Sequence, residues 1–150
     1  MEQVKHVRGK LLAGAIIGAA ALAFSISGER YTMVTGRDVL SIDLSALAPG
    51  TARKYGYADD AGRKLRFLLA RGEDGQVRSV FDVCRECYSY HKGYAISGNE
   101  LICRVCGNRY PIDRMTTGKA SCVPVALAHR EDRGIAKIRV ADVLAGRSLF

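Results

Sequence analysis

The stretch that decides the fold begins with Cys84-Arg85-Glu86-Cys87 and continues, after fifteen residues, with Cys103-Arg104-Val105-Cys106-Gly107. Each C-x-x-C pair places two thiols on one tight turn, and a hairpin between the pairs brings the two turns together. This spacing predicts a site where four thiolates bind a metal. All five cysteines lie within 39 residues, because the fifth, Cys122, comes just before Val123-Pro124.

The two pairs differ in the residue after the second cysteine. Gly107 comes after Cys106 and allows the positive φ with which the backbone curls over a thiolate and points N–H groups at it, as in zinc and iron knuckles. No glycine comes after Cys87, so Cys84 and Cys87 fit a helical turn with a redox-active dithiol equally well. Cys122 has three interpretations: a fifth ligand, a resolving thiol or a buried hydrophobic residue. Structural disulfides are a further alternative, although the number of thiols is odd and C-x-x-C loops are tight.

Aromatic and histidine side chains surround the cysteines. We expect four tyrosines to pack over the site and limit solvent access: Tyr88, Tyr90, Tyr94 and Tyr110. His91 and His129 are further ligand candidates, although a single histidine near a loop is more often solvated. No Ser/His/Asp set and no carboxylate pair competes with the cysteines, so the sequence predicts no catalytic residues.

An apolar run near the N-terminus predicts a membrane anchor. Residues 11–28 carry no charge and follow a basic flank with Lys5, Arg8 and Lys10. A helix of this length measures roughly 27 Å, close to the roughly 30 Å hydrocarbon core of a bilayer. We therefore expect residues 1–28 to form a single-pass transmembrane helix or an uncleaved signal.

The charges beside this run predict its orientation. The basic flank favours a cytoplasmic N-terminus, whereas Glu29 and Arg30 cancel each other. We therefore expect a protein of the cytoplasmic membrane with residues 29–150 as an extracytoplasmic domain. Cleavage near residues 21–23 is the alternative. A G-x-x-x-G at residues 14–18 offers a contact through which anchor helices can oligomerise.

After the anchor, the apolar residues mostly follow a period of two, which predicts a mainly β domain of small α+β type. Residues 31–35 and 39–44 flank Gly36-Arg37-Asp38 and predict a first hairpin. Three more runs, separated by Asp-Asp-Ala-Gly and Glu-Asp-Gly turns, predict a β-meander over residues 52–58, 64–71 and 77–83.

The end of the meander leads into the cysteine motif. Its last strand runs directly into Cys84, and a short hairpin of residues 94–96 and 100–102 delivers Cys103. This arrangement predicts a zinc-ribbon or rubredoxin-like cysteine knuckle on a rigid scaffold. A strand over residues 135–140 and a helical turn over 141–145 close the chain.

The chain is basic, with 23 Lys and Arg against 15 Asp and Glu and a net charge of +8. These cations are dispersed through strand-like segments and do not gather on one recognition helix, which argues against nucleic acid as a partner. The charge suits an anionic membrane surface or an acidic partner.

Three stretches are similar to the FtrD-like family of membrane iron-sulfur-containing proteins. They are Phe81-Asp82-Val83-Cys84-Arg85-Glu86-Cys87-Tyr88, Lys92-Gly93-Tyr94 and Cys103-Arg104-Val105-Cys106-Gly107-Asn108-Arg109-Tyr110-Pro111-Ile112. The resemblance extends over about residues 50–150 and includes Cys122-Val123-Pro124. The chain departs from the family at Ala120 and Ser121, where the family usually has two glycines.

The resemblance implies a membrane-attached, cysteine-ligated centre associated with iron uptake and extracytoplasmic electron transfer. The implied ligands are Cys84, Cys87, Cys103, Cys106 and Cys122. The implied cofactor is an iron-sulfur cluster or mononuclear iron, with zinc as the alternative. The implied partners are the cytoplasmic membrane and a membrane iron permease or redox protein.

Three functions are compatible with these observations. The first is a non-enzymatic electron carrier or metal-handling accessory to membrane iron transport. The second is an interaction module with a structural zinc ribbon, and the third is a thiol-disulfide oxidoreductase that uses Cys84, Cys87 and Cys122. The N-terminal Arg8-Gly9-Lys10 is not a twin-arginine signal, which favours a metal that loads after export over a preassembled cluster.

Overall fold

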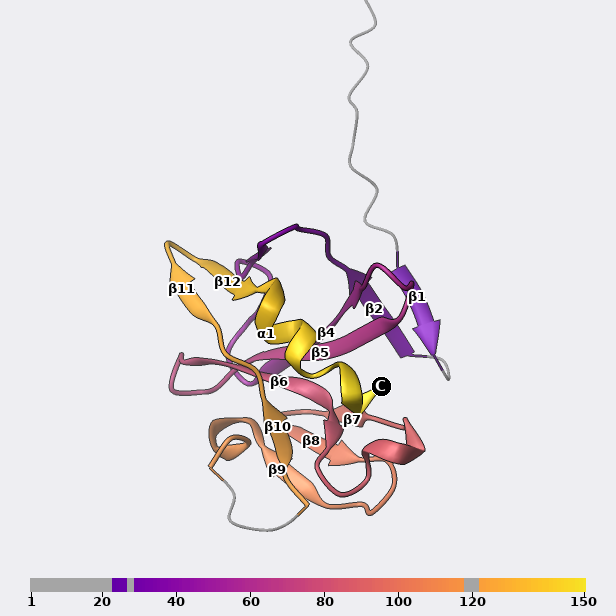
Figure 1. Cartoon of the computed structure of the whole chain (residues 1–150). Coiled ribbons are helices and arrows are strands. Elements are labelled where there is room, and N and C mark those ends of the chain that lie inside the picture. Colours follow the sequence, from indigo (N-terminus) through magenta and orange to yellow (C-terminus); the bar gives the residue numbers. More distant parts are fainter. Residues whose placement is uncertain (1–22, 27–28, 118–121) are drawn as a thin grey trace, which may run out of the picture.

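The computed structural model describes residues 23–26, 29–117 and 122–150, which form three sheets (Figure 1). The largest sheet has the order β1 (Ala23–Ile26), β2 (Glu29–Met33), β4 (Thr51–Ala58), β5 (Lys64–Arg71), β6 (Val77–Cys84) and β10 (Pro124–Ala126). The second has the order β11 (Arg130–Asp132), β12 (Ile135–Arg139) and β3 (Val39–Asp43). The third comprises β7 (Tyr94–Ser97), β8 (Glu100–Cys103) and β9 (Arg109–Pro111).

The helical elements are short. One α-helix, α1 (Val140–Ala145), follows β12 directly. Within the described ranges, three 3-10 turns lie at Tyr88–Tyr90, Ile112–Arg114 and Arg147–Leu149. The described part of the chain is therefore mainly β.

The predicted meander is confirmed. Strands β4, β5 and β6 pair in antiparallel order, with Phe67 of β5 opposite Tyr55 on one side and Phe81 on the other. Gly62 and Gly75 have φ values of 76° and 78° in the connecting turns, a region that favours glycine. Turn chemistry and alternating apolar residues thus determine the centre of the fold.

Both faces of this central sheet are covered. On one face, Leu65, Phe67 and Leu69 join a core with residues of β3, β12 and α1. On the other face, Leu68 and Ala70 join a second core with residues of the three-stranded sheet β7-β8-β9. The cysteine-containing half of the molecule therefore rests on the back of the central sheet.

The predicted first hairpin is wrong. Strand β2 pairs with β1 and, in parallel, with β4, whereas β3 pairs with β12. The separation buries Leu40 and Ile42 in the core beneath α1, opposite Ile138 and Ala136 of β12. These partners lie almost 100 residues away in sequence, so the local pattern does not reveal the pairing.

The predicted transmembrane helix is also wrong for the part of the N-terminal region that the structure describes. Most of the predicted anchor, residues 1–22 and 27–28, lies outside the described residues. The part that is described, Ala23–Ile26, is not helical and forms β1, whose backbone pairs with β2. No helix within the described ranges is long and apolar enough to cross a bilayer. The single-pass localisation is corrected accordingly, because the end of the apolar run serves as an edge strand.

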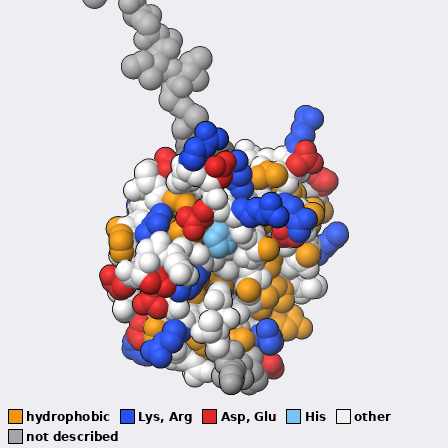
Figure 2. All heavy atoms as spheres, turned by 90° about the vertical axis from the view of Figure 1, so that its left-hand side faces the viewer, with side chains coloured by type: hydrophobic (Ala, Val, Ile, Leu, Met, Phe, Trp, Pro, Cys, Tyr) orange, Lys and Arg blue, Asp and Glu red, His pale blue; other side chains and the backbone are white. Residues whose placement is uncertain are grey.

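Charged side chains of both signs lie on the surface of the molecule. On the face in Figure 2, Lys and Arg side chains gather mainly toward the upper end and lie among Asp and Glu side chains. Ion pairs near β12 include Lys137 with Asp132 at 2.6 Å and Arg139 with Asp142 at 2.7 Å. Part of the positive charge is thus balanced locally on the surface.

Two adjacent residues of β3 test this arrangement. Leu40 is fully buried, whereas 43% of Val39 is exposed. Leu40→Ala should lower the free energy of unfolding by about 2–5 kcal/mol, because it leaves a cavity in the core. Val39→Ala should change it by less than about 0.5 kcal/mol. Urea denaturation measures both, and equal effects would contradict the packing of β3 against the central sheet.

Candidate metal centre

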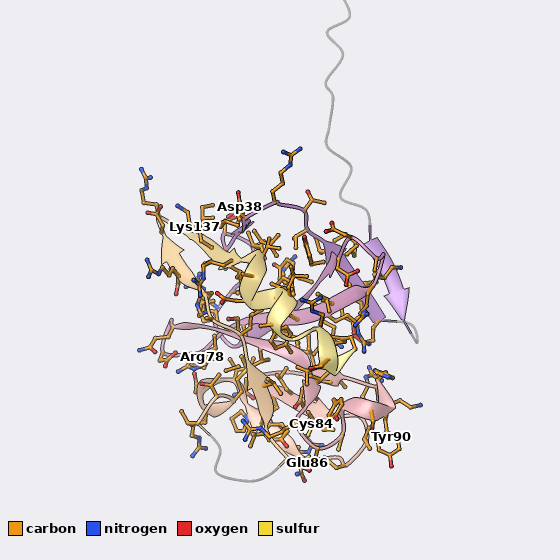
Figure 3. The ribbon with its side chains drawn as sticks, in the orientation of Figure 1. Asp38, Arg78, Cys84, Glu86, Tyr90 and Lys137 are labelled. Carbon is orange, nitrogen blue, oxygen red and sulfur yellow. The ribbon has the colours of Figure 1, made fainter. Side chains whose placement is uncertain are left out.

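Five thiols converge at one end of the molecule. Cys84 is the last residue of β6 and Cys103 the last of β8, whereas Cys87 and Cys106 lie on the turns after these strands. Cys122 lies two residues before β10. The five Sγ atoms all lie within 4.8 Å of one another. In Figure 3, Cys84 and Glu86 lie near the lower end of the molecule, far from Lys137 and Asp38 at the upper end.

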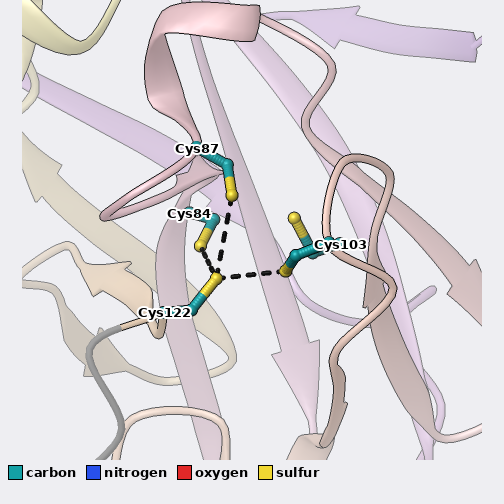
Figure 4. A group of neighbouring side chains, drawn as sticks. Cys84, Cys87, Cys103 and Cys122 are labelled. Carbon is teal, nitrogen blue, oxygen red and sulfur yellow. Dashed lines mark hydrogen bonds between the residues drawn. The ribbon is translucent and has the colours of Figure 1, made fainter.

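Cys122 occupies the middle of this group. Its Sγ lies 2.7 Å from that of Cys84, 3.1 Å from that of Cys106 and 3.8 Å from that of Cys87. In Figure 4, dashed lines join its sulfur to those of Cys84 and Cys87 and to one sulfur of the second pair. The fifth thiol is therefore part of the site and not a separate core residue.

Both pairs form the same kind of turn. Backbone N–H groups of Glu86 and Cys87 point at the Cys84 sulfur, and those of Val105 and Cys106 point at the Cys103 sulfur. In the second turn, the Gly107 N–H also donates to the Cys103 carbonyl at 2.9 Å, with a φ of 73° at Gly107. N–H groups directed at sulfur stabilise thiolates and thiolate-bound metals. This matching geometry favours two metal knuckles over a dithiol on a helix.

The inner wall of the site is apolar. Cys84 and Cys103 are buried in the second core together with Tyr94, Leu101 and Met115. Such a wall restricts the access of water to the inner thiols.

The tyrosines divide into two groups. Tyr94 and Tyr110 pack edge to face with ring centroids 5.8 Å apart, and the Tyr110 hydroxyl donates to the Cys122 carbonyl. Tyr88 and Tyr90 instead keep 41% and 64% of their surfaces exposed. Tyr110 therefore contacts the site directly, whereas the side chains of Tyr88 and Tyr90 are exposed to solvent.

The two predicted histidines lie elsewhere. The group of converging ligand atoms in the described part of the chain contains only cysteines. The His91 side chain is exposed, and His129 places Nδ1 2.8 Å from Ser79 Oγ. Neither histidine extends the thiol group.

The thiols differ in acidity. Burial raises the pKa of Cys122 and raises that of Cys87 to about 12. Burial also raises the pKa of Cys106, but hydrogen bonds from the Cys122 thiol and the Asn108 N–H outweigh it and lower that pKa to about 7. Burial also raises the pKa of Cys84, but hydrogen bonds from the Cys122 thiol and from the backbone N–H groups of Glu86 and Cys87 outweigh burial and lower that pKa. In the metal-free chain, Cys122 therefore keeps its proton between two more acidic thiols.

The donor set fits a thiophilic metal. Thiolates bound tetrahedrally to one ion at about 2.3 Å lie about 3.8 Å from one another. Sulfurs that all lie within 4.8 Å of one another suit a single ion, such as zinc or iron. A cluster whose thiolates bind different irons would require the two turns to move apart.

Sequence comparison identifies the family. The profile described as "Membrane iron-sulfur containing protein FtrD-like" matches residues 47–150. The chain belongs to the FtrD-like family. This membership confirms the resemblance noted in the sequence, and the family description supports an iron-sulfur-containing protein. A comparison with curated proteins finds no match.

Two solved structures are similar to this FtrD-like chain. One is a quaternary ammonium Rieske monooxygenase studied for carnitine oxidation by gut microbiota, with 20% identity and a TM-score of 0.43 over 64% of this chain and 28% of that one. The other is the quaternary ammonium Rieske monooxygenase CntA bound to an inhibitor, with 19% identity and a TM-score of 0.46 over 67% and 30%. The FtrD-like chain thus spans less than a third of either enzyme, and TM-scores below 0.5 give no information on its function.

The sequence pattern did not predict the buried charges behind the FtrD-like site. Lys54, Arg66 and Asp82 are almost fully buried. Asp82 interrupts the apolar run Val80-Phe81-Asp82-Val83, and a charged residue inside such a strand is a signal that could have indicated a buried polar network.

Selective alkylation tests the acidity of the thiols. Cys106 is exposed, and its pKa is about 7. In metal-free protein, iodoacetamide should therefore modify Cys106 first, with a half-maximal rate near pH 7, whereas an ordinary thiol reaches it near pH 8.5. Peptide mass spectrometry across pH 5–9 identifies the modified residue. Earlier modification of Cys122 would contradict the assigned hydrogen bonding.

Proposed function

We propose that the chain is a non-enzymatic electron carrier or metal-handling protein that holds iron through cysteine thiolates and serves a membrane iron transporter or its redox partner. The observation that carries this proposal is the convergence of five sulfurs within 4.8 Å of one another, four of them on two matching knuckles. Membership in a family described as iron-sulfur-containing supports iron over other thiophilic metals.

The residues of the chain have separate roles in this proposal. Cys84, Cys87, Cys103 and Cys106 would hold the metal, with Cys122 as a fifth thiol. When bound, iron supplies a one-electron redox couple whose potential depends on hydrogen bonds to sulfur and on burial. The N–H groups of both turns stabilise negative charge on the thiolates. The apolar core behind Cys84 and Cys103 excludes water, which leaves the outer thiols as the accessible side.

Exposure of Cys106 suits exchange with a partner. Cys106 is the most exposed of the five cysteines, and Val105 beside it is 37% exposed. Weak electron-transfer complexes use small surfaces that place the centre close to the partner. An iron permease or redox protein would therefore approach the turn of residues 103–107.

A structural zinc site is the second candidate. The observation in its favour is the sulfur spacing, which suits one tetrahedral ion without movement of either turn. In this case, the chain would be an interaction module stabilised by zinc.

Metal analysis distinguishes the two functions. Protein purified without oxygen should contain iron and should be coloured in its oxidised form, because ferric-thiolate and iron-sulfur centres absorb visible light. Plasma mass spectrometry and absorption spectra measure this directly. Colourless protein with about one zinc per chain, and no iron uptake on reconstitution, would support the structural module and refute the iron proposal.

A pair of cysteine variants tests the division of roles. Cys106→Ser should abolish metal binding and unfold the sheet β7-β8-β9, because metal binding is coupled to folding at such sites. Cys122→Ser should leave the fold intact, since Cys122 is the fifth thiol. Metal content and amide hydrogen exchange report both effects. Identical behaviour of the two variants would show that Cys122 is as essential as the paired cysteines.

A further inference from the structure

A buried carboxylate lies directly behind the first ligand turn. Asp82 precedes Cys84 by two residues on β6, and its side chain is fully buried. It accepts hydrogen bonds from the Tyr94 backbone N–H at 2.7 Å, from Lys54 Nζ at 3.2 Å and from the Tyr31 hydroxyl. Strands β2, β4 and β7 therefore each supply a donor to one carboxylate.

Lys54 extends this contact to the second ligand turn. Only 2% of its side chain is exposed, and its Nζ donates to the Tyr94 carbonyl and lies 3.1 Å from Glu29 Oε2. The other Glu29 oxygen binds Arg104, which lies between Cys103 and Cys106. The Arg104 N–H also donates to the Gly93 carbonyl at 3.1 Å. One polar network thus connects β6, which ends in Cys84, with the turn that carries Cys103 and Cys106.

The register of strands β7 and β8 places this network close to the second ligand turn. Tyr94 lies directly opposite Cys103 in the β7-β8 pair. Asp82 and Lys54 bind the N–H and the carbonyl of this residue. The hydrogen bond between Asp82 and Tyr94 therefore links the strand that ends in Cys84 to the hairpin that ends in Cys103, at a distance of a few residues from each thiol.

Gly93 allows this close approach. It is buried with a φ of 63°, and a Cβ at this position would lie 2.7 Å from Asp82 Oδ1. Any side chain here would push the loop away from the carboxylate. Gly98, at the tip of the same hairpin, has a φ of 57° with no atom within 4 Å of an added Cβ.

A buried charged network is costly and is weak support for stability alone, and its best attested use is to specify one arrangement. We propose that Asp82, held by Lys54 and Tyr31, is a positioning residue that sets the separation between the Cys84–Cys87 and Cys103–Cys106 turns, so that four thiolates meet one metal. This inference rests on the proposed metal site but not on the identity or redox role of the metal.

Cobalt(II) is a suitable probe, because tetrahedral thiolate coordination gives it intense visible bands that report the ligand geometry. Gly93→Ala in the full chain should weaken Co²⁺ binding by about 10–100-fold, as for other outer-shell contacts, and should shift these bands. Gly98→Ala imposes the same backbone strain without the clash and should leave both unchanged. Chelator competition measures the affinity, and equal effects of the two substitutions would refute the proposal.

Asp82→Asn tests the same contact through charge. Asparagine keeps the size of the side chain and an acceptor for Tyr94, but its NH₂ cannot accept from Lys54 or Tyr31. We expect weaker Co²⁺ binding and shifted bands, whereas Asp74→Asn, which removes a surface ion pair with Arg78, should change neither. Wild-type affinity and spectrum in a folded Asp82→Asn protein would refute the positioning role.

If the Asp82→Asn variant does not fold, the comparison of Gly93→Ala with Gly98→Ala decides whether the positioning role holds. Failure of the wild-type chain to bind Co²⁺ through thiolates would refute the metal site and the positioning role together.

Discussion

Burial of β5 on both faces is the constraint on which the rest of the structure depends. Leu65, Phe67 and Leu69 require a cover on one side, and Leu68 and Ala70 require a cover on the other. Sheet β11-β12-β3 with α1 meets the first requirement, and sheet β7-β8-β9 meets the second. Because both covers are small, neither has a core of its own, and each depends on the central sheet for its apolar contacts.

The thiol site draws its rigidity from this dependence. Cys84 ends a strand of the central sheet, whereas Cys103 ends a strand of the covering sheet. The site therefore spans the boundary between two layers and would not form from either alone. The same boundary contains the buried network around Asp82 and Lys54, so polar contacts and apolar packing act together on the distance between the turns.

Local patterns predicted the parts of the fold that depend on neighbours in sequence. The meander β4-β5-β6 and the hairpin β7-β8 result from turn residues and period two, and the five thiols that the spacing singled out do converge. The pairing of β3 with β12 depends on burial of Leu40 beneath a distant strand, which a local window does not contain. The uncharged run of residues 11–28 suggested a membrane helix that includes Ala23–Ile26, because an edge strand and the end of a membrane segment share an apolar composition. The buried Arg66 was missed because it alternates with Lys64 and apolar residues, a pattern that normally indicates an exposed face, and Lys54 was missed because lysine is rarely buried.

Strand β10 links the fifth thiol to the mechanics of the whole sheet. It has only three residues, begins with a proline and forms the edge of the sheet, with Pro124 opposite Cys84. If Cys122 joins the four paired cysteines as a ligand, the metal would reversibly cross-link Cys84 and Cys122, which are 38 positions apart in the chain. Such a cross-link lowers the entropy of the unfolded chain. Loss of the metal would then loosen the edge strand β10 first. The order of this strand at the surface would therefore depend on whether the site holds a metal.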